Sequence, residues 1–219
     1  TMHVAPGLNL CTTLRPDTLA GGLRIAARAA LLALLVTLGG PRSPVVGQTA
    51  PVDSLPEVLH RAHAHNDYLH ARPLLDALEQ GFNSAEVDIH LVGDDLLVAH
   101  DLEEVDPART LEALYLRPLR ERVAANGGSV HPGAPPFLLL IDVKSGAEPT
   151  YARLHPLLRR YADLFTFAVD DLVVEGPVVA VLSGNRPRSA LLAAPIRFAA
   201  YDGRLPDLEA YSSLPPDFM

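Results

Sequence analysis

The stretch SAEVDIHL, residues 84–91, places Glu86, Asp88 and His90 at every second position of an otherwise apolar run. Successive side chains of a β-strand point to opposite faces, so these three share one face while Val87 and Ile89 share the other. Burying carboxylates is costly unless they find a partner, a metal or a ligand. The stretch therefore predicts a strand with a core on one face and a functional site on the other.

The same alternation recurs in other apolar stretches. His63 and His65 are one residue apart, as are Asp142 and Lys144, and His100 ends a further apolar run. A fold can tolerate one such pair as an accident, but several of them predict that the side chains converge on one pocket. His90 continues the phase of the first stretch, and a core role is the expectation for it.

Strand-like and helix-like segments alternate along the rest of the chain. Polar residues at the carboxyl ends of strands, with helices in between, favour a parallel sheet and a (β/α) barrel. The predicted fold class is therefore α/β, of the TIM (β/α)8-barrel type and incomplete at the C-terminus of this chain, with an open sheet as the alternative. Strands are expected at residues 58–64, 84–91, 96–100, 137–143, 178–182 and 197–201, and helices at 74–80, 110–125 and 150–161.

The beginning of the chain is typical of a targeting segment. Arg24 and Arg28 precede the apolar run 29–38, and small residues at 45–47 suit a signal peptidase. We expect residues 1–47 to be a signal peptide, with export to the periplasm or the medium, or else an N-terminal membrane anchor. A linker at 48–56 and the truncated (β/α) barrel at 57–219 follow.

The composition limits the classes of partner. The net charge is -8 and Lys and Arg are not clustered, which argues against nucleic acid. The single cysteine, Cys11, cannot form an internal disulfide. We expect a small-molecule or lipid-derived partner, which is compatible with contact with a membrane surface, and no protein partner is inferred.

The acidic residues suggest a metal. Glu86, Asp88 and Asp142 form an oxygen-rich set of the kind that holds one divalent cation, Mg²⁺ or Ca²⁺. Lys144 can place a positive charge beside a phosphate oxygen that such a cation binds. Arg186 follows an apolar strand and can reach a phosphate, although a turn before a helix explains it equally well.

The histidines suggest proton transfer. His63 and His100 end different strands, so one can accept a proton while the other donates one across a scissile bond. A metal, a cation and paired imidazoles together suit the hydrolysis of a phosphodiester.

Three motifs in order carry a resemblance to a known superfamily. They are HAHNDY at 63–68, GFNSAEVDIH at 81–90 and LVAHD at 97–101. Together they resemble the glycerophosphodiester phosphodiesterases and phosphatidylinositol-specific phospholipases C, and most of all the branch named after the yeast altered-inheritance-of-mitochondria protein 6. Spider-venom sphingomyelinase D is more distantly similar, through a start that matches His63 to Asn66 and a strand that matches Asp142 to Lys144. The similarity covers about residues 60–201.

The resemblance implies a TIM-barrel hydrolase with residues in specific roles. The acid and base pair maps to His63 and His100, and Lys144 maps to the lysine that follows the last metal ligand. We predict that Asn66, Lys144 and Arg186 contact the substrate. The resemblance places the divalent metal on Glu86, Asp88 and Asp142.

Two other functions remain open from the sequence. His63 and His65 have the spacing of zinc ligands in an amidohydrolase-like barrel, since neutral imidazoles at a strand end suit that metal. A non-catalytic alternative is an exported ligand-binding or vestigial barrel that keeps these residues without the closing strands.

Overall fold

The computed structural model describes residues 56–170, 172–205 and 207. All of them belong to the second of the two units into which the chain divides, Thr1–Ala50 and Pro51–Met219. The predicted targeting segment, and the predicted linker except for Pro56, lie outside the described residues. Among the helices that are described, none combines the length and the hydropathy that crossing a membrane requires.

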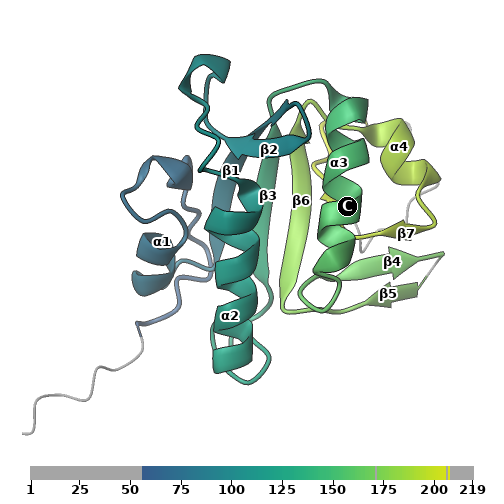
Figure 1. The fold of residues 1–219 in the computed structure, drawn as a ribbon. Helices are drawn as coiled ribbons and strands as arrows, with labels where there is room; N and C mark the ends of the chain where they lie inside the picture. Colours follow the sequence, from purple (N-terminus) through teal and green to yellow (C-terminus); the bar gives the residue numbers. More distant parts are fainter. Residues whose placement is uncertain (1–55, 171, 206, 208–219) are drawn as a thin grey trace, which may run out of the picture. The chain divides into compact units, whose positions relative to one another are not determined.

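A five-stranded sheet in the order β2-β1-β3-β6-β8 forms the centre of this unit (Figure 1). Strands β1, β3, β6 and β8 are parallel neighbours, and β2 pairs antiparallel with β1. The chain before β1 adds isolated parallel bridges, from Leu59 to Phe82 and from Ala64 to Ala85. The strands are β1 (Ser84–Val92), β2 (Asp95–Val98), β3 (Phe137–Val143), β6 (Val178–Gly184) and β8 (Ala200–Tyr201).

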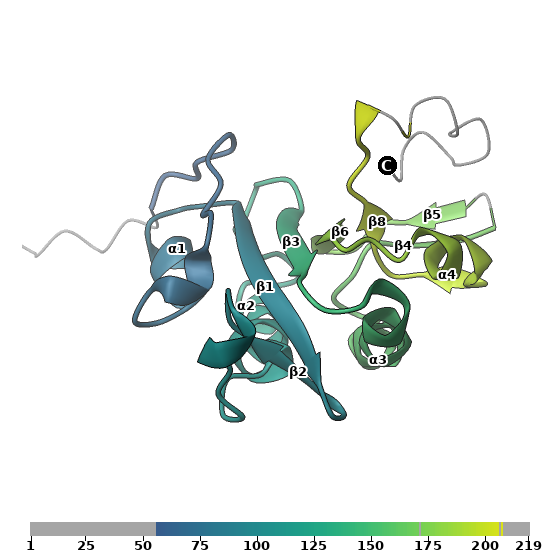
Figure 2. The ribbon, with the colours of Figure 1, turned by 90° about the horizontal axis from the view of Figure 1, so that it is seen from above.

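Helices α2 (Arg117–Ala125) and α3 (Ala147–Arg160) cover one face of this sheet, as the two views show (Figures 1 and 2). The buried positions of α3 include Tyr151, Leu154 and Leu158, which recur at the three- and four-residue spacing of one helix face. A π-helical turn, Glu112–Leu116, leads into α2. Two shorter helices, α1 (Leu75–Glu79) and α4 (Arg188–Ala193), flank the sheet.

The core lies between the sheet and these helices. Val87, Ile89, Leu139 and Ile141 are fully buried in one hydrophobic cluster, together with Leu154 of α3. They occupy alternate positions of β1 and β3, because only every second side chain of a strand points to a given face. The intervening residues of both strands point to the other face, which the helices do not cover.

A second, smaller sheet was not predicted. It has the order β5-β4-β7 and consists of antiparallel pairs of short strands. Its members are β4 (Phe167–Val169), β5 (Leu172–Val174) and β7 (Ile196–Arg197). The strand predicted at 197–201 is therefore two strands, because β7 joins the small sheet and β8 joins the central one.

The predicted α/β class with a parallel sheet is confirmed, and no closed barrel forms among the described residues. The predicted strand 96–100 is present as β2, but it pairs antiparallel with β1 and does not extend the parallel sheet, because Gly93, at φ +61°, lets the chain turn back as a hairpin. The predicted strand 58–64 consists of bridges only. Helix 110–125 begins with the π-helical turn, and helix 150–161 begins earlier, at Ala147.

Candidate functional site

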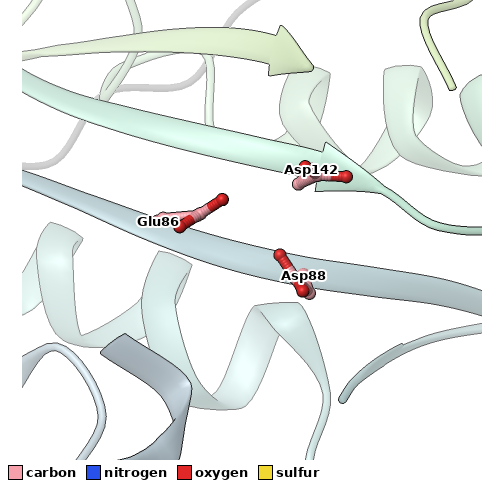
Figure 3. A group of neighbouring side chains, drawn as sticks. All are labelled: Glu86, Asp88 and Asp142. Carbon is pink, nitrogen blue, oxygen red and sulfur yellow. The ribbon is translucent and has the colours of Figure 1, made fainter. Parts of the chain in front are cut away.

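Three carboxylates meet on the face of the sheet opposite the helices. Figure 3 shows Glu86 and Asp88 on β1 beside Asp142 on β3. One carboxylate oxygen of each lies within 4.8 Å of the others, so the group can hold a metal ion. The parallel register explains the convergence, since Asp88 is the direct neighbour of Asp142 across the two strands.

The carboxylate of Asp88 is fully buried, and its two oxygens differ in their hydrogen-bond partners. Its Oδ2 lies 2.7 Å from the Tyr68 hydroxyl, which donates to it, 2.9 Å from His100 Nδ1 and 3.1 Å from Lys144 Nζ. Its Oδ1 is buried without a hydrogen-bond partner. Buried acceptors are rarely left unpaired, so this oxygen is suited to a cation.

Asp142 and Lys144 show that negative charge dominates the cluster. Desolvation raises the pKa of Asp142, and the charges of Asp88 and Glu86 add to this, although Lys144 opposes it. Desolvation alone would lower the pKa of Lys144, but its hydrogen bond to Asp88 and the charges of Asp88 and Asp142 raise it. Lys144 Nζ is 3.4 Å from Asp142 Oδ1, which makes no hydrogen bond. A hard cation would compensate the remaining charge, so the donor set fits Mg²⁺ or Ca²⁺.

Gly184, at the end of β6, is a site residue that the sequence reasoning missed. It pairs with Val143, and a Cβ atom at this position would lie 2.1 Å from Asp142 Oδ1. Its φ of +68° is also one that residues with a side chain rarely adopt. Only glycine leaves room for the Asp142 carboxylate at this point, and the signal in the sequence was a glycine at the end of a mainly apolar strand.

Glu86 is held from the segment before β1. Its Oε2 accepts a hydrogen bond of 3.0 Å from the backbone N–H of Asn66 and lies 3.4 Å from His65 Nε2. Asn66 adopts a left-handed conformation with φ +51°, and its side-chain oxygen lies 3.1 Å from the oxygen of the Tyr68 hydroxyl. Asn66 and Tyr68 thus help to fix the positions of Glu86 and Asp88, and the sequence alone predicted no role for Tyr68.

Each of the two candidate acid-base histidines contacts a side chain of β1 through Nδ1. His63 Nδ1 lies 2.7 Å from Ser84 Oγ, and His100 Nδ1 contacts Asp88. Desolvation lowers the pKa of His63, with a smaller contribution of the same sign from His65 and an opposing one from Glu86. The side chain of His100 is 52% exposed, so a substrate can reach it.

His90 and Arg186 make contacts of a different kind. His90 is buried, as expected of a core histidine, and its Nε2 lies 3.0 Å from the carbonyl oxygen of His100. The Arg186 guanidinium donates to the Asp202 carbonyl and to the Asp207 carboxylate, and it stacks over Tyr201. The structure does not pair Arg186 with the acidic cluster, and its contact with substrate remains a prediction.

Comparisons with known proteins point to one family. Residues 56–202 match the family model described as the AIM6-like phosphodiesterase domain. The chain is 34% identical over 209 residues to altered inheritance of mitochondria protein 6 of Eremothecium gossypii, covering 85% of this chain and 54% of the relative. It is 30% identical over 174 residues to the homolog of that protein in Arthroderma benhamiae, covering 69% of this chain and 55% of the relative. No solved structure matches the chain at a significant level.

The comparisons correct the expected location. The curated relatives are named for the inheritance of mitochondria and not for export. The segment on which export rested, residues 1–47, lies outside the described residues, so no signal peptide supports the expectation. Export is therefore withdrawn.

The chain spans about half the length of the curated relatives it matches, whereas the family model covers nearly all of the described residues. The match includes all three carboxylates as well as His63, His100 and Lys144. By this match the chain belongs to the AIM6-like phosphodiesterase domain family.

Proposed function

We propose that this chain is a metal-dependent phosphoric diester hydrolase. The acidic cluster carries the proposal, because the buried, unpartnered Oδ1 of Asp88 lies among carboxylate oxygens that can hold one cation. Membership of a phosphodiesterase domain family supports the same reaction class. Mg²⁺ and Ca²⁺ are the proposed ions, since both prefer oxygen ligands.

The residues around the cluster have separate roles in this proposal. Glu86, Asp88 and Asp142 would hold the cation, whose chemistry is to polarise a phosphoryl oxygen and to stabilise its negative charge. Lys144 Nζ, between Asp88 and Asp142, adds a positive charge next to that oxygen. His63 and His100 exchange protons with the attacking and leaving oxygens, and each uses Nε2 because Nδ1 faces β1.

The proposed architecture is the first part of a (β/α) barrel. The segment with the bridges at Leu59 and Ala64, then β1, β3, β6 and β8, are sequential parallel neighbours, as in a TIM barrel. The carboxylates lie on the uncovered face, which corresponds to the interior of such a barrel. The antiparallel β2 is an addition at the end of β1.

A glycerophosphodiester or phospholipid-type substrate is the proposed class. Leu69 and His100 line the same cavity of about 320 Å³, and Leu69 is largely exposed. Leu102, also exposed, follows His100 by two residues. Exposed leucines beside an acid-base histidine would suit the apolar part of a lipid substrate and contact with a membrane surface.

The zinc amidohydrolase alternative lacks a matching arrangement. His63 contacts Ser84 while His65 contacts Glu86, and neither belongs to the group of metal-binding side chains found among the described residues. Zinc sites need imidazoles directed at one point. Stoichiometric zinc lost in His65→Ala would revive this alternative.

The test is hydrolysis by the full chain. We expect product from bis(p-nitrophenyl) phosphate or glycerophosphocholine with Mg²⁺ or Ca²⁺, loss of activity with a chelator, and recovery when the ion is restored. His63→Ala and His100→Ala should each lower kcat at least ~10²-fold, the low end of acid-base catalysis. His60→Ala, at an exposed histidine of the same segment as His63, is the matched control. Unchanged activity in both site variants would refute the proposal, and a folded chain that binds metal without hydrolysing either diester would indicate a non-catalytic domain.

A further inference from the structure

The segment containing His63 has a fixed register against β1. Ala64 pairs with Ala85, through hydrogen bonds of 2.9 Å from Ala64 N–H to the Ser84 carbonyl and from Glu86 N–H to the Ala64 carbonyl. Parallel pairing in this register puts His63 next to Ser84 and His65 next to Glu86. The two histidines therefore have different neighbours on β1, one a neutral hydroxyl and the other a carboxylate.

Ser84 is the hydrogen-bond partner of the His63 ring. The distance from Ser84 Oγ to His63 Nδ1 is 2.7 Å, and the described residues provide no other hydrogen bond to that ring. His63 is exposed, so without this contact the imidazole would be free to rotate into solvent. Ser84 is in phase with Glu86 and Asp88 on β1, so this contact also ties the ring to the face that carries the carboxylates.

The contact has a counterpart at His100. That ring is also held through Nδ1, by Asp88, which lies on the same strand and the same face as Ser84. When the Nδ1 proton of a histidine is held by an acceptor, Nε2 is left to exchange protons with a substrate. Strand β1 would then set which nitrogen reacts in both rings, with a hydroxyl for His63 and a carboxylate for His100.

We infer that Ser84 is a positioning residue for His63: the Ser84 hydroxyl oxygen accepts a hydrogen bond from Nδ1–H of His63 and thereby directs Nε2 to the substrate. This inference rests on the proposed function for its catalytic consequence. Its structural part, a neutral His63 with the proton on Nδ1, is independent of any activity.

The first experiment determines which ring nitrogen of His63 carries the proton. Long-range proton–nitrogen NMR spectra of the full chain, above the pKa of His63, should show the proton on Nδ1 in the wild type. Ser84→Ala should convert His63 to a mixture of the two neutral forms, and Ser84→Thr, which keeps the hydroxyl, should restore the Nδ1 form. Ser183→Ala is the control, because Ser183 Oγ donates to Asp202 and not to a histidine.

The second experiment measures kcat and KM for the hydrolysis of bis(p-nitrophenyl) phosphate. Ser84→Ala should lower kcat about tenfold, with KM and the affinity for Mg²⁺ unchanged within about twofold, because only the orientation of one acid-base group is lost. Ser84→Thr should recover most of kcat. A merely structural serine would change the melting temperature without this split.

Two results would overturn the inference. One is a wild-type His63 with its proton on Nε2, and the other is a Ser84→Ala variant whose His63 spectrum is unaltered. A wild type without hydrolytic activity would refute the proposed function instead, while the NMR result would still decide the role of Ser84.

Discussion

The two faces of the β1–β3 pair are made by alternate residues of the same strands and differ in almost every property. On the helix-covered face Val87, Leu139 and Ile141 are completely buried and apolar. On the opposite face Asp88 and Asp142 pair side by side, and the rest of that face is partly open. The covered face stabilises the fold through buried apolar side chains. The opposite face carries the carboxylates of the candidate site, whose burial lowers stability.

The apolar face supports the face that carries the carboxylates. The carboxylates cannot stabilise themselves, because desolvation and like charge both act against ionised Asp142. The apolar residues between them hold the strands in register, and the register alone brings the carboxylates together. Changes on the covered face should therefore affect stability, and changes on the open face should affect metal binding.

The largest expected effect on stability is on the covered face. Leu139→Ala should lower the free energy of unfolding by about 2–5 kcal/mol, because Leu139 is 0% exposed within the main core cluster. Denaturant-induced unfolding measures this change. A loss below about 1 kcal/mol would mean that the two faces are not as different in packing as the structure indicates.

Removing the charge of Asp142 should raise stability, whereas Leu139→Ala lowers it. Burial raises its pKa above the unfolded value, so its ionised form reduces stability at pH values above the folded pKa and has no effect below the unfolded pKa. Without metal, Asp142→Asn should therefore melt at a higher temperature than the wild type at neutral pH, and the gain should disappear in acid. Differential scanning calorimetry measures both.

The same variant should lose metal affinity. Isothermal titration with Mg²⁺ or Ca²⁺ should show a loss of at least about tenfold, since one of three carboxylates no longer carries charge. A lower melting temperature together with an unaltered metal affinity would contradict the assignment of this face to metal binding.

The smallest effect on the free energy of unfolding is expected at Leu138, the neighbour of Leu139. Leu138 is 37% exposed on the open face, whereas its neighbour Leu139 is fully buried. Leu138→Ala should change the free energy of unfolding by no more than about 1 kcal/mol, as at other partly exposed positions. Leu138 and Leu139 are both leucines of β3. Comparable losses of unfolding free energy in the two variants would therefore show that the open face is covered in solution.

Much of the centre of the molecule was predictable because alternation has a simple physical cause. The patterns at Glu86 and Asp88 and at Asp142 gave both the strands and the shared face, and the structure confirms the convergence of these carboxylates. The metal-binding capacity followed from the same period of two residues. The roles of His63 and His100 in catalysis stay predictions.

What the sequence did not reveal depends on contacts between distant segments. The 2–3 residue strands of the small sheet are too short for a period to be recognised, and nothing local distinguishes β7 from β8. The role of Gly184 depends on how closely β6 approaches the Asp142 carboxylate, which no local pattern encodes. By contrast, the antiparallel direction of β2 had a local signal that was not used, because Gly93 and Asp94 form a two-residue connection typical of a hairpin.

The hairpin of β1 and β2 has a consequence for folding. It returns His100 to Asp88 after only 12 residues, without a helical crossover. Contacts between near neighbours in the chain close small loops, which form rapidly and at low entropic expense. The contact between a proposed acid-base histidine and a proposed cation ligand is thus a local one, able to assemble early and to persist when more distant strand pairings are disturbed.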